Sequence, residues 1–180
     1  TAFITNDEEE HRGQFILVNS VKPLSQSLIF ELLPTTTARL PKRLAQKRLA
    51  TVILECLNYE PWSPLNRRIK TPTNPEGIVK DNSVIRMLEN SIQDGALFTY
   101  RDPATGLGDI DSMVALVANF WTAVELTFPE DWNQPPRRSR LMHGVGIVAL
   151  GALMDDISRD LQRSEEHTSE LQSQFRISYA

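Results

Sequence analysis

Few features of the sequence suit a secreted or membrane protein. Cys56 is the only cysteine, which excludes an internal disulfide and is typical of a reducing, cytoplasmic compartment. The longest uncharged apolar run, residues 144–154, is much shorter than the roughly 20 residues that a membrane-spanning helix needs. The formal net charge of −4 also excludes a global positive field of the kind that attracts nucleic acid. We therefore expect a cytoplasmic protein with no membrane partner.

Patterns typical of catalytic and metal sites are lacking as well. No glycine-rich segment is followed by the lysine of a phosphate-binding Walker loop. Ser139 and His143 lie four residues apart, but no third residue and no nucleophile elbow accompanies them. Asp155 and Asp156 fall near the end of a predicted helix, and we interpret them as solvated rather than as metal ligands. The residues thus predict no catalytic group, no metal site and no identifiable cofactor.

Apolar residues at helical spacing are abundant, and they predict a predominantly α chain of the α+β class. The predicted helices cover residues 6–19, 25–33, 41–58, 81–95, 109–128 and 139–162. Short strands are predicted at 2–5 and 96–100, and either an ordered loop or a short strand at 68–70. Gly144, Gly151 and Ala152 predict that the last helix approaches a neighbour closely. The stripes of the last two long helices predict a shared core of Val117, Phe120, Trp121, Val148 and Leu153.

Three segments carry a resemblance to a known family: residues 15–34, 69–91 and 135–155. They resemble the DGQHR-domain family, which is similar to the ParB-like fold and to DndB-like proteins associated with DNA sulfur modification. The resemblance covers most of residues 1–162. It implies that residues 1–34 are the end of an α/β part, with one strand and one helix, and that residues 35–162 form a helical domain.

The Asp-Gly-Gln-His-Arg motif that names this family is not found in the chain. The nearest string is Glu-Glu-Glu-His-Arg at residues 8–12, where Glu9 stands in place of the glycine. Glycine lets a backbone turn tightly beside a ligand, and glutamate does not. The acidic residues also suit the first turn of a helix. We therefore expect the motif to lie upstream of Thr1, so that the chain would be a C-terminal fragment without it.

Two basic clusters become candidates because the resemblance implies an association with DNA. The first contains Arg137, Arg138 and Arg140, at the start of a predicted helix whose N-terminus itself favours phosphate. The second contains Arg67, Arg68 and Lys70. A solvated surface is the alternative interpretation of both clusters. Asn19 and Lys22 are ligand candidates from the resemblance, or else Asn19 only ends a helix and Lys22 is solvated.

Residues 163–180 differ in texture from the rest of the chain. Read back into codons, residues 163–173 resemble the constant part of a common short-read sequencing adapter, and residues 177–180 resemble its later constant part. Residues 174–176 fall where a variable index would lie. We therefore interpret residues 163–180 as a non-native tail translated from sequencing read-through. The tail carries two arginines and three glutamates, so the net charge of residues 1–162 is −3.

These observations leave three functional hypotheses. The first is a non-catalytic, DNA-associated module in DNA modification, phage defence or transcriptional control, with DNA and other proteins of such systems as partners. The second is the C-terminal part of a nucleotide-dependent enzyme whose active site lies upstream. The third is a helical protein-interaction domain.

Overall fold

The computed structural model describes residues 8–19, 25–35, 42–102 and 108–177, with side chains at all of these except residues 19, 42–46 and 165–177. These residues form seven α-helices, one short 3-10 helix and one two-stranded parallel sheet, which confirms the predicted, predominantly α fold class. Among them, no helix combines the length and the apolar character that crossing a bilayer requires. The strand predicted at residues 2–5 lies outside the described residues.

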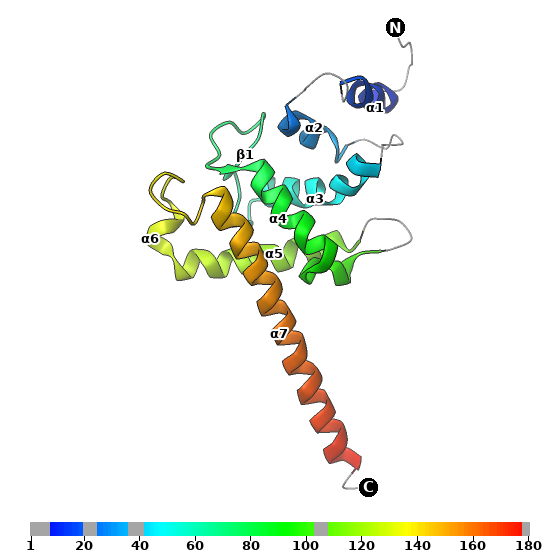
Figure 1. Ribbon diagram of the computed structural model, residues 1–180, viewed down its shortest axis with the longest axis vertical. Coiled ribbons are helices and arrows are strands. Elements are labelled where there is room, and N and C mark those ends of the chain that lie inside the picture. The colour runs from blue at the N-terminus through cyan, green and yellow to red at the C-terminus, as the bar shows by residue number, and fades with distance from the viewer. Residues whose placement is uncertain (1–7, 20–24, 36–41, 103–107, 178–180) are drawn as a thin grey trace.

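Three helices form the centre of the molecule: α3 (Lys42–Tyr59), α4 (Asp81–Asp94) and α5 (Ile110–Thr127). Figure 1 shows α7 (Gly144–Ile177) running along α4 and continuing well beyond the body. The short helices α1 (Glu8–Asn19) and α2 (Gln26–Leu32) lie at the opposite end. A one-turn helix, α6 (Pro129–Trp132), follows α5 directly and precedes the segment that leads into α7.

The hydrophobic core lies where α3, α4 and α5 meet. Ile53 and Leu57 on α3, Leu88 on α4, and Val117 and Trp121 on α5 have no exposed surface. Burying a side chain of this size stabilises a fold by about 1.5–3 kcal/mol. These apolar side chains recur at helical spacing, and their burial against one another holds the three helices together.

Of the predicted shared core, Val117 and Trp121 on α5 are buried as expected, whereas Phe120 and Val148 are only half-buried. Phe120 packs against the core with its ring edge-on to Trp121, at 5.8 Å between ring centroids. Leu153, by contrast, is 49% exposed. The prediction for Leu153 is wrong because α7 presents Gly151 and Met154, not Leu153, to the interior.

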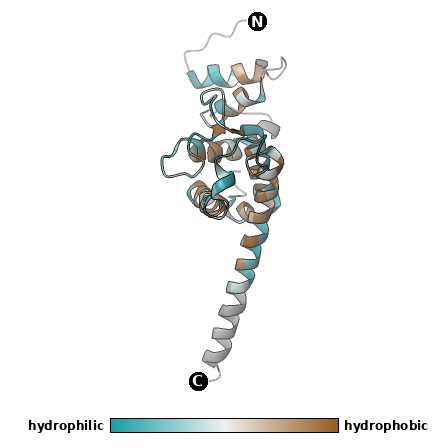
Figure 2. Cartoon of the chain, turned by 90° about the vertical axis from the view of Figure 1, so that its left-hand side faces the viewer, coloured by the Kyte–Doolittle hydropathy of each residue, from teal (hydrophilic) through white to brown (hydrophobic). Residues whose placement is uncertain are grey.

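The predicted close approach of the last helix is confirmed for Gly144 and Gly151, with α4 as the neighbour, but not for Ala152, which is exposed. A Cβ atom on Gly144 would lie 2.6 Å from Oγ of Ser83, and one on Gly151 would lie 2.2 Å from Cγ of Met87. Ser83 and Met87 are one turn apart on α4, so both glycines rest on the same face of that helix. Beyond the contact the packing ends, because residues 159–164 are exposed. Figure 2 shows hydrophilic and hydrophobic residues alternating along the last coloured turns of α7.

Asp155 closes the end of α4. Its Oδ1 atom accepts hydrogen bonds from Oγ of Ser91 and from the backbone N–H of Ala96, at 2.9 Å for the second. Ser91 Oγ in turn accepts from the N–H of Leu97. Gly95 leaves room for this arrangement, because a Cβ there would lie 2.4 Å from the Asp155 carboxylate. The sequence-based interpretation of Asp155 as solvated is therefore wrong.

Two predicted element types and boundaries also need correction. Residues 96–100, predicted as a strand, form a 3-10 helix (Ala96–Tyr100), since Ser91 and Asp155 fix its first N–H groups. The last helix begins at Gly144 rather than at residue 139, because residues 135–143 form turns instead. His143 precedes the helix, and its Nδ1 atom accepts a hydrogen bond from the N–H of Val145.

The two strands, β1 (Ile69–Lys70) and β2 (Val79–Lys80), run parallel with Ile69 opposite Val79. β1 confirms the short-strand alternative at residues 68–70. Parallel strands usually need a crossover of a dozen or more residues, but residues 71–78 make this one without a helix. Buried Asn74 holds the loop together, since its Nδ2 donates to the carbonyl oxygens of Arg67 and Ile69.

Candidate functional site

Arg68, one of the predicted DNA contacts, is used inside the protein. Its guanidinium lies 4.7 Å from the ring centroid of Trp132, Nη1 donates to Oδ1 of Asn133 at 3.1 Å, and Nη2 donates to the carbonyl oxygen of Trp132. Burial lowers the pKa of Arg68, and the negative charge of Glu125 partly offsets that effect. A planar guanidinium suits such stacked, forked contacts, so Arg68 is a structural clamp between β1 and α6.

This clamp brings the two predicted basic clusters onto adjoining segments. Arg67 and Lys70 flank Arg68 on one segment, whereas Arg137, Arg138 and Arg140 follow Asn133 on the other. All five of these remaining side chains are exposed. The name "basic surface" is used below for these five residues. Arg67 has a left-handed φ of 56° and its guanidinium lies 5.2 Å from the Tyr59 ring centroid, so the turn presents it at a fixed place.

The predicted link between this cluster and a helix N-terminus is wrong. Arg137, Arg138 and Arg140 lie in the turns before α7, where the N–H of Arg138 donates to the carbonyl oxygen of Pro135. At the helix start itself, His143 accepts from the N–H groups of Val145 and Ile147. Those N–H groups are thus occupied internally.

Nothing that the structure describes brings the other two predicted ligand residues, Asn19 and Lys22, to the basic surface. Asn19 is the last residue of α1, and its side chain is not among those described. Lys22 lies outside the described residues.

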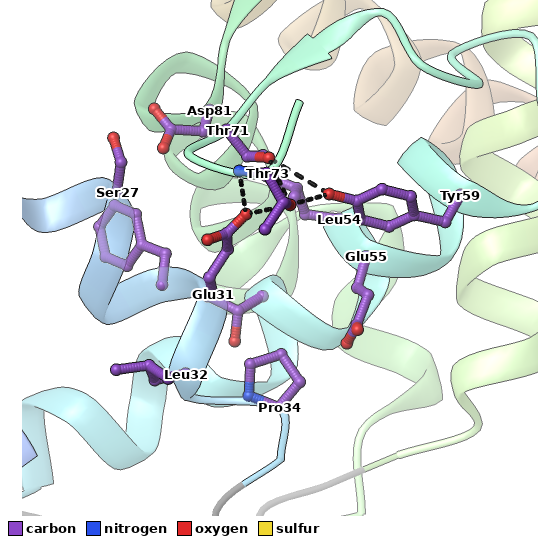
Figure 3. A pocket seen from close by; sticks show the side chains of 12 residues that line it. Ser27, Glu31, Leu32, Pro34, Leu54, Glu55, Tyr59, Thr71, Thr73 and Asp81 are labelled. Atoms are coloured by element: carbon purple, nitrogen blue, oxygen red, sulfur yellow. Dashed lines mark hydrogen bonds between the residues drawn. The ribbon is translucent and has the colours of Figure 1, made fainter. Parts of the chain in front are cut away.

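The structure also contains a pocket that the sequence did not indicate. It has a volume of about 450 Å³ and lies between α2, α3, the loop after β1 and the first residue of α4. Figure 3 shows three carboxylates around it, those of Glu31, Glu55 and Asp81. The remaining lining consists of hydroxyl groups and apolar side chains: Ser27, Phe30, Leu32, Pro34, Thr51, Leu54, Tyr59, Thr71 and Thr73. Among the residues whose side chains are described, none of those lining it is basic, so we call it the acidic pocket.

One wall of the acidic pocket is fixed by hydrogen bonds. Glu31 accepts from both the N–H and the hydroxyl of Thr73 through the same oxygen, Oε1, at 2.9 Å for the N–H. The Tyr59 hydroxyl lies 2.5 Å from the Thr73 hydroxyl and 3.2 Å from that of Thr71. Helix α2 is in this way joined to the loop between the strands and to the end of α3 (Figure 3).

The other two carboxylates of the acidic pocket have poor compensation. Asp81 is only 5% exposed; its Oδ1 accepts from the N–H of Asn82 at 2.6 Å, but its Oδ2 is buried without a partner. Burial, and to a smaller extent the negative charge of Glu31, raises the pKa of Glu55. Within the described residues, no group of three or more His, Cys, Asp or Glu converges as a metal site would require.

Sequence reasoning missed this pocket because its lining comes from four separate segments, residues 27–34, 51–59, 71–73 and 81. A weak signal was available in Asp81. An acidic residue that opens a helix is ordinarily solvated, yet here it directly follows the short strand Val79–Lys80, which places it inside.

Comparison with known proteins adds no family to these observations: no family model, no curated protein and no solved structure matches the chain.

Proposed function

We propose that the chain is a non-catalytic module that associates with DNA through the basic surface, in DNA modification, phage defence or transcriptional control in the cytoplasm. The observation that carries the proposal is the Arg68 clamp, which joins the segment of Arg67 and Lys70 to Trp132 and Asn133, a few residues before the arginines at 137, 138 and 140. The resemblance of residues 15–34, 69–91 and 135–155 to DGQHR-domain proteins supports it from the sequence side.

The chemistry of the basic surface suits phosphate rather than bases. Guanidinium groups bind phosphate oxygens through paired hydrogen bonds, and such contacts position a protein on DNA without reading its sequence. Exposed Glu130 and Asp131 on α6 lie close to Asn133 in sequence and weaken the local field. Binding should therefore be weak, independent of sequence and sensitive to salt.

Fluorescence anisotropy with a labelled duplex at several salt concentrations tests the proposal. Three phosphates neutralised by Arg137, Arg138 and Arg140 give a slope of log affinity against log salt near −3, at roughly 0.9 per phosphate. Replacing all three arginines by alanine should remove most of the binding and flatten the slope. The matched control replaces Arg86 and Arg159, exposed arginines on α4 and α7, and should leave binding close to that of the unchanged protein.

Two results would end the DNA proposal: no binding by the unchanged protein even at low salt, or equal losses in the triple variant and the control. The helical interaction domain would then be the better hypothesis. It is favoured by large apolar side chains at the surface, Trp62, Leu126 and Val145, of which Leu126 and Val145 are 76% and 71% exposed. Within the described residues, nothing specifically favours the nucleotide-dependent enzyme.

A further inference from the structure

The acidic pocket has the charge pattern of a binding site for a cation. Glu31, Glu55 and Asp81 contribute carboxylates from α2, α3 and α4, and none of the described residues that line the cavity is a lysine or arginine. Lys47, a described lysine that contacts Phe30 of the lining, is already engaged: its ammonium group is 3.0 Å from Oε2 of Glu89 and 5.3 Å from the centroid of the Phe30 ring. The negative charge of the pocket is thus not balanced by its own lining.

Asp81 is the residue that points most directly to a missing partner. A carboxylate taken out of water needs a hydrogen-bond donor or a positive charge, and an oxygen left without one is costly. Oδ2 of Asp81 is buried without such a partner, and the residue lines the acidic pocket. A ligand in the pocket can supply the missing donor once the Asp81 side chain turns its Oδ2 toward the cavity.

The shape of the site favours an organic cation over a metal ion. A metal ion needs several ligand atoms at 2.0–2.6 Å from one point, and no such convergence exists among the described residues. The cavity of about 450 Å³ instead separates the carboxylates by apolar side chains, among them Phe30, Leu32 and Leu54. A molecule with a positively charged end and several methylene groups could pair with the carboxylates and pack on the apolar side chains.

We propose that the acidic pocket binds an aliphatic amine or guanidinium cation, which donates hydrogen bonds to Asp81 and to the Glu31–Glu55 pair and lays its methylene groups on Phe30 and Leu54. Glu31 can serve without rearrangement, because Thr73 occupies only its Oε1 atom and holds the carboxylate in place. The raised pKa of Glu55 agrees with the pairing, since a bound positive charge would offset both causes of the shift. The inference does not depend on DNA binding.

Such a group can reach the pocket as a free small molecule or as the side chain of a lysine or arginine in a peptide. Isothermal titration calorimetry on the whole chain separates these sources with four probes. Putrescine and agmatine represent the free cations, a short lysine-containing peptide amide represents the side chain, and 1,4-butanediol is the uncharged control. We expect binding of at least one cationic probe and none of the diol.

Asp81→Asn tests the role of the pocket, because it removes the charge with little change in shape. We expect its affinity for the cationic probe to fall at least tenfold, while Glu130→Gln, which removes an exposed charge on α6, leaves the affinity unchanged. Equal losses in the two variants would indicate a general charge effect and overturn the proposal. The absence of binding by every cationic probe at millimolar concentration would overturn it as well.

Amide chemical shifts of the unchanged protein give a second readout that does not depend on how well Asp81→Asn folds. The proposal expects the titration to move the signals of Thr73, Asp81 and Asn82 first. Shifts confined to other parts of the described chain would contradict it.

Discussion

The two ends of α4 differ in how they hold a carboxylate, half-buried Asp155 at one end and buried Asp81 at the other. At the C-terminal end, Asp155 of α7 accepts from Ser91 and Ala96, and the chain around Gly95 is shaped to admit it. At the N-terminal end, Asp81 keeps one buried oxygen without a partner beside a cavity. The hydrogen bonds of Asp155 are made within the protein. Asp81 lies beside a cavity and has an oxygen that accepts no hydrogen bond. The comparison separates a carboxylate that stabilises the fold from one that is available to a ligand.

The largest loss of stability is expected where α7 packs on α4, because that contact brings Asp155 to the C-terminal end of α4. Gly151→Leu would drive a side chain into Met87, whose Cγ is 2.2 Å from the position of a Cβ on residue 151. We expect a loss of about 3 kcal/mol in the free energy of unfolding, measured by urea titration. Ala152→Leu, at the exposed neighbouring position, is the control and should stay within about 0.5 kcal/mol.

Asp155→Ala should have the next largest effect. It leaves the buried Ser91 hydroxyl and the Ala96 N–H without their acceptor, at a cost of about 2 kcal/mol. The adjacent Asp156→Ala removes only an exposed ion pair with Arg159, which is worth about 0.5 kcal/mol or less. Equal losses for the two variants would mean that the C-terminal end of α4 is not closed by Asp155.

Asp81→Asn should cost less than about 1 kcal/mol in the same titration, since it removes mainly a favourable charge at a helix N-terminus. The contrast between Asp155 and Asp81 would fail if this variant lost as much stability as Asp155→Ala. In that case Asp81 would be structural, and its free oxygen would not indicate a ligand.

A smaller, pH-dependent change in stability is expected for Glu55, which lines the acidic pocket together with Asp81. Its pKa in the folded state lies above the ordinary value of 4.5, so the folded state favours the protonated form. The stabilisation by protonated Glu55 is fully present below the ordinary pKa of 4.5 and is lost as the pH rises through the higher pKa of the folded state. Thermal melts should therefore show that Glu55→Gln gains on the unchanged protein between pH 4 and pH 7. An advantage that shrinks as the pH rises would refute the assignment.

The smallest effect is expected from ending the chain after Gln162. The described residues from 159 to 164 are exposed, and residues 163–180 are interpreted as non-native from the sequence. The melting temperature should not change measurably in a calorimetric scan. A drop of several degrees would show that the outer part of α7 contributes to the fold.

The sequence predicted what local periodicity can encode. The helices at 81–95 and 109–128 were predicted within a residue or two of α4 and α5, because both have clear apolar stripes and end at capping or breaking residues. Residues 96–100 were misread as a strand, since their short apolar run does not distinguish a strand from a tight helical turn. What decides the matter is Asp155, about 60 positions later, and no local pattern reports that contact.

The candidate sites were predicted less well, for the same reason. Residue type alone indicated Arg68 as a surface cation, but Trp132 and Asn133 lie more than sixty residues away in the sequence and bury half of it. The acidic pocket was missed altogether, because Glu31, Glu55 and Asp81 meet only in the folded chain. The surface positions of Arg67 and Lys70 could be predicted from residue type, since no distant segment among the described residues covers them.

The two glycines of α7 also restrict how that helix can move. Gly144 and Gly151 are seven residues apart, close to the 7.2 residues of two helical turns, and each faces a side chain of α4. Sliding α7 by one turn, about 5.4 Å, would bring Ile147 or Val148 to the place that Gly151 occupies against Met87. Neither side chain fits there. The helix therefore has a single axial register on α4, and a pull or push on its outer part cannot be absorbed by stepwise sliding.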